Sequence, residues 1–377
     1  MKLDLLYEID VPKPWAGEHP YAQRREEQRA YREALDQIRY ADTLGFNTVW
    51  CVEHHFRENR SHMPCSEAVL GALSQITRNL RLGFGVTLTP HPFIHPARLA
   101  EKVATVDVLS GGRVEWGTGR STPMEQTAFG VDRDLSRHQW RAAIDTVVKM
   151  WEQEYYEEHS EFLDFPRRMV TPKPVQDPHP PCWMAAVSED SATLAGEAGL
   201  GVLAMSIMRP LEETARLVQR YREAQKRPKP LTRVRTDKVA AYTLVHCVED
   251  RKDLDRRDIW RSVWWWYQNL AEFALEWELP HYSPEERDKA FPLLQARARG
   301  EVDVDTFDRE AMIIIGTPDE CLEKIQRYAD VGVDQVICYK QFGYIANEDV
   351  KRSMTLLGEH VIPKLNAAST APAPAPA

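Results

Sequence analysis

Short apolar runs alternate with longer amphipathic stretches almost from one end of the 377-residue chain to the other. Several of the short runs are apolar on both faces, which is typical of strands in a parallel sheet that helices cover. The runs lie at residues 3–9, 47–52, 80–88, 112–118, 181–187, 201–206, 238–248 and 334–339. Helices are expected over residues 24–44, 96–109, 136–158, 190–198, 210–226, 318–331 and 348–365. This pattern predicts an α/β protein that folds as a (β/α)8 TIM barrel, with an open sheet and a helical second domain as the alternative.

One long segment does not follow the alternation. Residues 249–316 are too long for a simple connection between the seventh and eighth predicted strands, so we interpret them as an insertion. An insertion at the active-site end of a barrel commonly forms a lid or a wall of the site. This one carries Trp264, Tyr267 and Phe273, which either line a substrate site or pack the inserted helix itself.

Composition and charge exclude several classes of protein. A net charge of −9 argues against a nucleic-acid surface, which needs clustered Lys and Arg. No apolar run approaches the ~18 residues of a membrane span, and no signal peptide is expected. The six cysteines form no CxxC pair, which fits a reducing cytoplasm and indicates neither disulfides nor structural zinc. The Ala/Pro-rich segment 366–377 is expected to be disordered, which leaves one domain over residues 1–365.

Three polar residues, Glu53, His54 and His55, directly follow the apolar run at 47–52. Neighbouring residues of a strand point to opposite faces, so adjacent histidines are poorly arranged as ligands of one metal ion, and no metal site is expected. A hydrogen-bonded pair of surface histidines is the structural alternative. Because active sites of barrels lie at the C-terminal ends of strands, we favour a general acid/base role.

Two other strand ends carry groups suited to an anion. Gly117–Ser121 follows a predicted strand, and Arg120 within it offers the forked donor that phosphate accepts. Ser188 and Ser191 lie where the next predicted strand gives way to a helix, whose first N–H groups favour an anion. An exposed arginine in a turn and a serine that only caps its own helix are the alternatives. A phosphate beside Ser188 would also require the acidic residues of that first turn to point outward.

Taken together, these motifs resemble the bacterial-luciferase-like flavin monooxygenases. The similarity rests on "GFNTVWCVEHHF", "HPARLAEKVATVDVLSGGRVEWGTGR", "SEDSATLAGEAGLG" and "GTPDECLEKI…VGVDQV", and it covers most of residues 1–365. Gly119 stands where luciferase carries its reactive cysteine, which argues against luciferase itself. The glutamate often found in the family near Ala142 is also missing.

The resemblance implies a site for reduced FMN, or for the related deazaflavin. It makes His54 the catalytic histidine, with His55 as a support or a substrate contact, and Arg120 the phosphate-binding arginine. The loop with Val187, Ser188 and Ser191 is expected to hold the same phosphate. The strand with Gly85 and Val86 is expected to lie against the flavin ring, often through a non-prolyl cis peptide.

The resulting hypothesis is a monooxygenase that uses reduced FMN and O2 to oxygenate a small, apolar or aromatic substrate. No GxGxxG motif follows a strand, and no reductase domain is recognisable, so a separate flavin reductase is expected to supply the flavin. Family members are commonly homo-oligomers, and we expect the same here. The alternatives are a deazaflavin-dependent oxidoreductase and a flavin-binding protein without turnover.

Overall fold

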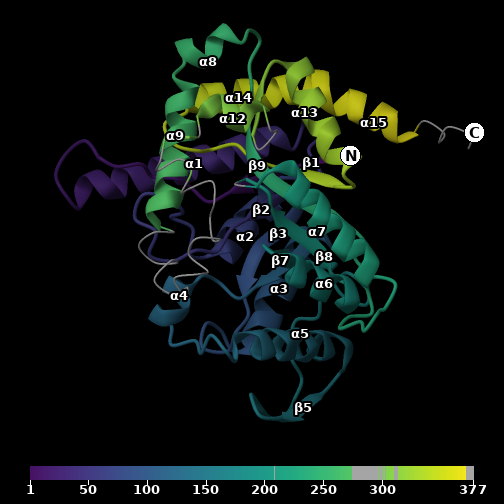
Figure 1. The fold of residues 1–377 in the computed structure, drawn as a ribbon. Coiled ribbons are helices and arrows are strands. Elements are labelled where there is room, and N and C mark those ends of the chain that lie inside the picture. Colours follow the sequence, from purple (N-terminus) through teal and green to yellow (C-terminus); the bar gives the residue numbers. More distant parts are fainter. Residues whose placement is uncertain (208, 274–295, 297–299, 302, 310–312, 371–377) are drawn as a thin grey trace, which may run out of the picture.

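Eight parallel strands form a closed barrel in the described part of the chain (Figure 1). The computed structural model describes residues 1–207, 209–273, 296, 300–301, 303–309 and 313–370. The barrel strands are β1 (Lys2–Tyr7), β2 (Thr48–Cys51), β3 (Arg81–Leu88), β4 (Val114–Gly119), β7 (Cys182–Ala186), β8 (Gly201–Met205), β9 (Val239–Cys247) and β11 (Gln335–Tyr339). The barrel closes because β9 pairs with both β8 and β11, and β11 pairs with β1. The predicted TIM barrel is therefore confirmed, and the open-sheet alternative is wrong.

Helices lie outside the barrel and follow the strands in sequence (Figure 1). They are α1 (Tyr21–Ala41), α2 (Ser66–Ile76), α3 (Pro96–Ser110), α4 (Pro123–Ala128), α5 (Ser136–Glu152), α6 (Glu189–Ala198), α7 (Leu211–Ala224), α13 (Pro318–Asp330) and α14 (Asn347–Leu356). The sequence does not predict α2, because this helix carries a single charged side chain, Glu67, and its polar face is weak. Pro96 begins α3 and Gly111, at φ +69°, ends it, as the sequence predicts.

The predicted helix over 136–158 is too long. The chain leaves α5 at Glu152 and forms an antiparallel hairpin of β5 (Tyr156–His159) and β6 (Asp164–Arg168). The buried Tyr156 packs its ring 6.2 Å from that of Phe165 on the opposite strand. Contacts across the hairpin thus override the helical pattern, which the residues of β5 would otherwise continue.

The insertion begins as expected after β9, with α8 (Lys252–Arg256) and α9 (Ile259–Phe273). Its predicted end at residue 316 needs correction, because β10 (Ile314–Gly316) already pairs in parallel with the last residues of β9. A short helix, α12 (Val304–Arg309), lies between α9 and β10 in the sequence. The helix α9 packs on the C-terminal end of the barrel, where the Tyr267 hydroxyl donates to the Ile207 carbonyl over 2.6 Å.

The C-terminal helix extends further than predicted. α14 continues through a π-helical segment, Leu357–Val361, into α15 (Ile362–Thr370). Residues 366–370 therefore belong to a helix, although the sequence predicts disorder for them, and residues 371–377 lie outside the described part. In the described ranges, no helix is both long enough and apolar enough to cross a lipid bilayer.

Two tryptophans close the interior of the barrel halfway along the strands. Trp50 and Trp183 meet edge to face with ring centroids 5.4 Å apart, and both are almost completely buried. Their indole N–H groups donate to Asp4 over 3.0 Å and to Glu115 over 2.6 Å, near the N-terminal ends of the strands. The ring of Trp50 lies directly on the backbone of Gly83. We call this pair the tryptophan floor, with Asp4 and Glu115 on its N-terminal side.

We expect Gly83→Ala to destabilise the protein by about 1–3 kcal/mol, the usual cost of overpacking a core. A Cβ atom on Gly83 would lie 2.3 Å from the Trp50 ring, which Trp183 and Asp4 hold in place. The free energy of unfolding in urea measures the effect. Gly71→Ala on α2 is the matched control, since nothing lies within 4 Å of its Cβ position and alanine favours a helix. Equal stability of the two variants would show that the floor is adaptable.

Candidate active site

The predicted catalytic and cofactor residues all lie at the C-terminal end of the barrel. His54 follows β2, Gly85 and Val86 lie in β3, Arg120 follows β4, and Ser188 follows β7. Inside this end, Val86, Met205 and Tyr242 stay partly exposed beside the apolar cluster above the tryptophan floor. Catalytic groups of TIM barrels come from these strand ends, so this mouth of the barrel is the candidate active site.

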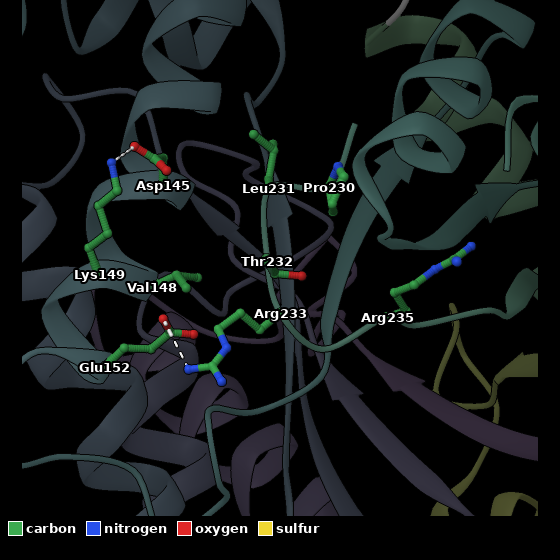
Figure 2. A pocket seen from close by; sticks show the side chains of 9 residues that line it. All are labelled: Asp145, Val148, Lys149, Glu152, Pro230, Leu231, Thr232, Arg233 and Arg235. Atoms are coloured by element: carbon green, nitrogen blue, oxygen red, sulfur yellow. Dashed lines mark hydrogen bonds and ion pairs between the residues drawn. The ribbon is translucent and has the colours of Figure 1, made fainter. Parts of the chain in front are cut away.

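A groove of about 490 Å³ lies elsewhere on the molecule, between α5 and residues 230–235 (Figure 2). Residues 230–235 precede β9, so the groove lies near the N-terminal ends of the strands. Four of its charged side chains form two ion pairs, Lys149–Asp145 at 2.6 Å and Arg233–Glu152 at 3.8 Å (Figure 2). We therefore do not assign the active site to this groove.

The first residue of the Glu-His-His motif has a structural role. Glu53 accepts a hydrogen bond of 2.9 Å from Lys102 of α3, whose ammonium group also lies 3.2 Å from Glu67 of α2. The other Glu53 oxygen lies 3.9 Å from His55 Nε2. This buried network fixes the loop after β2 to two helices and turns the ring of His55 toward Glu53.

His54 has a different carboxylate partner, which the sequence analysis does not identify. Its Nδ1 lies 3.1 Å from Oε1 of Glu125, a fully buried residue of α4. Glu125 also accepts the His55 backbone N–H over 2.6 Å, and the hydroxyl groups of Ser121 and Thr122. The sequence marks Glu125 only as the end of a capping box that begins at Thr122, a signal for a helix start and not for a site.

Electrostatics assign the protons of this pair. Burial alone would raise the pKa of Glu125, but His54, Arg57 and the donated hydrogen bonds hold it well below its ordinary value. The ionised carboxylate can only accept, so Nδ1 of His54 carries the hydrogen. Burial and the nearby Arg57 lower the pKa of His54, although Glu125 and Glu8 oppose this. At neutral pH His54 is therefore a neutral imidazole whose Nε2 is free to accept a proton.

Three arginines, Arg120, Arg133 and Arg137, lie close together near the loop after β4. Arg120 donates to the Ser136 hydroxyl over 3.0 Å, and burial together with Arg137 and Arg133 lowers its pKa. In the described ranges, no carboxylate lies within ion-pair distance of any of the three guanidinium groups. Like charges held together in this way favour an anion between them. The sequence analysis predicts Arg120 but misses Arg133 and Arg137, which flank Ser136 at the start of α5.

Ser188 caps α6, which was the structural alternative. Its hydroxyl accepts the Ser191 N–H over 3.2 Å, and the Ser191 hydroxyl accepts the Ser188 N–H over 3.0 Å. Glu189 turns outward to Arg220 of α7, at 2.8 Å, so it leaves the helix N-terminus open. Val187 is 51% exposed. The outward turn of Glu189 meets one half of the condition for an anion here, the other half being the orientation of Asp190 in the same turn.

The predicted cofactor loops converge around β3. The peptide bond between Gly85 and Val86 is cis, as the family resemblance implies, and the register of β3 against β4 shifts at this point. A Cβ atom on Gly119 would lie 2.5 Å from Val86 and 3.9 Å from the Cβ of Ala185, at the end of β7. Glycine at position 119 thus lets three strand ends meet closely.

The predicted substrate residues on α9 differ in burial. Tyr267 is 1% exposed and packs in the apolar cluster, which favours the packing interpretation for this residue. Trp264 is partly buried against the same cluster. Phe273 is the last residue of α9, and its side chain lies outside the described part of the structure.

A different aromatic cluster, missed by the sequence analysis, lies beside the His54–Glu125 pair. The ring of Phe129, directly after α4, lies 4.9 Å from those of His55 and Phe93, and 5.7 Å from that of Phe56. Phe56 is 62% exposed. These four rings come from three separate loops, so no local pattern in the sequence brings them together.

These residues fit a phosphorylated flavin better than a metal ion. Within the described residues, no group of three or more His, Cys, Asp or Glu side chains could hold a metal. Arg120, Arg133 and Arg137 offer donors suited to phosphate, and so, separately, does the N-terminus of α6. The bulge at Gly85 and Val86 offers a partly exposed apolar surface suited to a flat ring system.

A closed parallel barrel whose C-terminal loops carry a histidine–carboxylate pair and a group of arginines has the architecture of a TIM-barrel enzyme. Residues 15–335 match the luciferase-like monooxygenases, and the chain belongs to this family. The family includes FMN-dependent monooxygenases and F420-dependent oxidoreductases.

Individual relatives cover both kinds of cofactor. The oxygenase component of the flavin-dependent trigonelline monooxygenase of Acinetobacter baylyi is 30% identical over 201 residues, 52% of this chain and 55% of that protein. The match thus spans about half the length of that relative. An F420-dependent glucose-6-phosphate dehydrogenase of Amycolatopsis mediterranei is 24% identical over 356 residues, 90% of this chain and 96% of that protein. The crystal structure of monooxygenase RslO1 from Streptomyces bottropensis superposes with a TM-score of 0.73 at 26% identity, and the match covers 97% of this chain and 100% of that one.

Proposed function

We propose that this chain is the oxygenase component of a two-component monooxygenase, which uses reduced FMN and O2 to oxygenate a small apolar or aromatic substrate. The observation that carries the proposal is that Arg120, Arg133 and Arg137 lie at the same end of the barrel as the His54–Glu125 pair, in a chain of the luciferase-like monooxygenase family. Reduced flavin supplies the two electrons that, with O2, place one oxygen atom in the substrate and release the other as water. The trigonelline relative, named as an oxygenase component, supports a separate reductase.

Each part of the mouth has a proposed task. Arg120, with Arg133 and Arg137, would hold the flavin phosphate, and Gly85 and Val86 would seat the ring. His54 would move a proton at Nε2 during oxygen transfer, because that atom has no hydrogen-bond partner among the described residues while Glu125 occupies Nδ1. The closely packed rings of the tryptophan floor would limit the access of water from the N-terminal side of the barrel.

The test is oxygen uptake in the presence of a flavin reductase, NADH and one flavin at a time. We expect substrate-dependent uptake with FMN for at least one member of a panel of aldehydes, ketones, sulfides and N-heteroaromatics that includes trigonelline. Substrate-dependent reduction of F420 under anaerobic conditions, without oxygen uptake, would instead establish the second candidate, a deazaflavin-dependent oxidoreductase. The F420-dependent relative over 90% of the chain favours that candidate. Flavin binding without any turnover would indicate a non-catalytic flavoprotein.

Assembly and location stay predictions. A homo-oligomer is expected from the family resemblance, and size-exclusion chromatography with light scattering measures it. The expected cytoplasmic location follows only from the cysteine usage and the missing apolar segments. Fractionation of the native host would test it.

A further inference from the structure

Glu125 has more contacts than the start of a short helix needs. Its carboxylate accepts hydrogen bonds from the Ser121 and Thr122 hydroxyls and from the His55 N–H, and it also faces His54 Nδ1 at 3.1 Å. The side chain is completely buried. A buried carboxylate is costly unless donors surround it, and here one of the donors is the predicted catalytic ring.

A second capping box in the same protein shows what the motif looks like without that extra contact. Thr317 and Glu320 form a capping box at the start of α13. Glu320 accepts from the N–H and the hydroxyl of Thr317, over 2.7 and 3.0 Å, but its side chain is 36% exposed and it pairs with Arg251 on the surface. Capping alone therefore explains Glu320, whereas it does not explain the burial of Glu125 or its orientation toward a histidine.

The charges around His54 show what Glu125 changes. Arg57 and Glu8 are the other charged groups that act on the ring, and Arg57 opposes a positive charge there while Glu8 favours it. Glu8 is already engaged by Arg60 at 2.9 Å. Glu125 is thus the charged group that touches His54, and it decides which ring nitrogen carries the hydrogen.

We propose that Glu125 is the positioning residue of the active site: it fixes His54 as the Nδ1–H tautomer, so that Nε2 accepts the proton in the reaction. The role of Nε2 in a reaction rests on the proposed function. The choice of tautomer depends only on residues of this chain. It also means that the start of α4 and the working form of His54 depend on the same carboxylate. Loss of the carboxylate should therefore affect His54 even where the helix survives.

The test is histidine NMR on the protein without flavin, which makes it independent of any activity. With 15N-labelled histidine at pH 7.5, the His54 signals, assigned by their loss in His54→Ala, should show Nδ1–H in the wild type. In Glu125→Gln, a substantial Nε2–H population should appear, and the proton affinity of His54 should fall about tenfold, since an adjacent negative charge is lost. Glu320→Gln, the matched capping control, should leave both properties unchanged.

Two further variants separate positioning from folding. Thr122→Val removes the cap hydroxyl but keeps the carboxylate, so Tm should fall while the His54 tautomer stays the same. Glu125→Asp withdraws the carboxylate from Nδ1 by one methylene and serves if Glu125→Gln does not fold. An unchanged tautomer and proton affinity of His54 in the folded Glu125 variant would overturn the proposal.

Turnover supplies the last measurement. Glu125→Gln should oxidise substrate about tenfold more slowly, the scale of one charge-assisted hydrogen bond, with FMN affinity unchanged. Because His54 must be neutral to accept a proton, its lower pKa should move the rise of kcat/KM to lower pH. The His54 tautomer could change in Glu125→Gln while neither the wild type nor any variant consumes oxygen. In that case the proposed function fails and the positioning role stands. If the wild type turns over and Glu125→Gln leaves both the tautomer and the pH profile unaltered, only the positioning role fails.

Discussion

Replacing His54 with alanine is expected to reduce substrate oxidation by about 10²–10⁴-fold while reduced FMN still binds. The structure places Nδ1 of His54 against the buried Glu125 and leaves Nε2 available at the mouth of the barrel. Alanine offers no group that can take the proton, and the arginine cluster that is proposed to hold FMN comes from other loops. Reduced flavin should then be spent on hydrogen peroxide instead of product.

The measurement is the yield of product and of hydrogen peroxide per reduced FMN in wild type, His54→Ala and His55→Ala. His55 turns to Glu53 and Phe129, so its loss should reduce product less than the loss of His54 does. His360→Ala, an exposed histidine at the far C-terminal helix, is the control for the substitution itself. Normal turnover by His54→Ala together with an inactive His55→Ala would reverse the assignment. Normal turnover by both would make the Glu-His-His motif a purely structural feature.

Arg120→Ala is expected to weaken FMN binding by about one to two factors of ten, the scale of lost charge-assisted hydrogen bonds to phosphate. Riboflavin has no phosphate, so its affinity should hardly change. Arg120 is partly buried and already points to Ser136, and Arg133 and Arg137 add to the positive potential there. Loss of the more exposed Arg137 should cost less than loss of Arg120, since solvent screens its charge.

Fluorescence titration of FMN and of riboflavin into each variant measures these affinities. Arg98→Ala is the control, because Arg98 lies on α3 and pairs only with Glu101 among the described residues. The contrast between the two flavins should shrink as salt is raised. An equal loss of affinity for FMN and riboflavin would contradict the phosphate assignment and would indicate a general distortion of the loop after β4.

The barrel was predictable because its evidence is local and repeated. Runs such as 201–206 are apolar on both faces, and only strands covered by helices need this pattern. The sequence predicts the end of α5 too late, because the β5–β6 hairpin depends on a contact between Tyr156 and Phe165 across two strands. A pattern read along the chain does not contain that contact.

In the candidate site, too, features set by local sequence were predictable and contacts between distant segments were not. His54 and Arg120 could be chosen from the sequence because each directly follows a strand, and position in a barrel indicates function. Glu125 could not, since 71 positions separate it from His54 and its capping box already accounts for it locally. Phe56, Phe93 and Phe129 likewise become neighbours only when the loops after β2, β3 and β4 meet. Where a residue's partner lies in another loop, the sequence indicates the loop but not the pair.

The tryptophan floor has a consequence for how such an enzyme evolves. Below Trp50 and Trp183, buried polar groups such as Asp4 and Glu115 accept the indole N–H groups and have no part in the proposed site. The residues proposed for catalysis and cofactor binding lie on the other side of the floor, mostly in loops. Selection for a new substrate can therefore act on the upper loops while purifying selection preserves the lower half. Duplicated copies of this gene could therefore diverge in substrate while they keep the same stable fold.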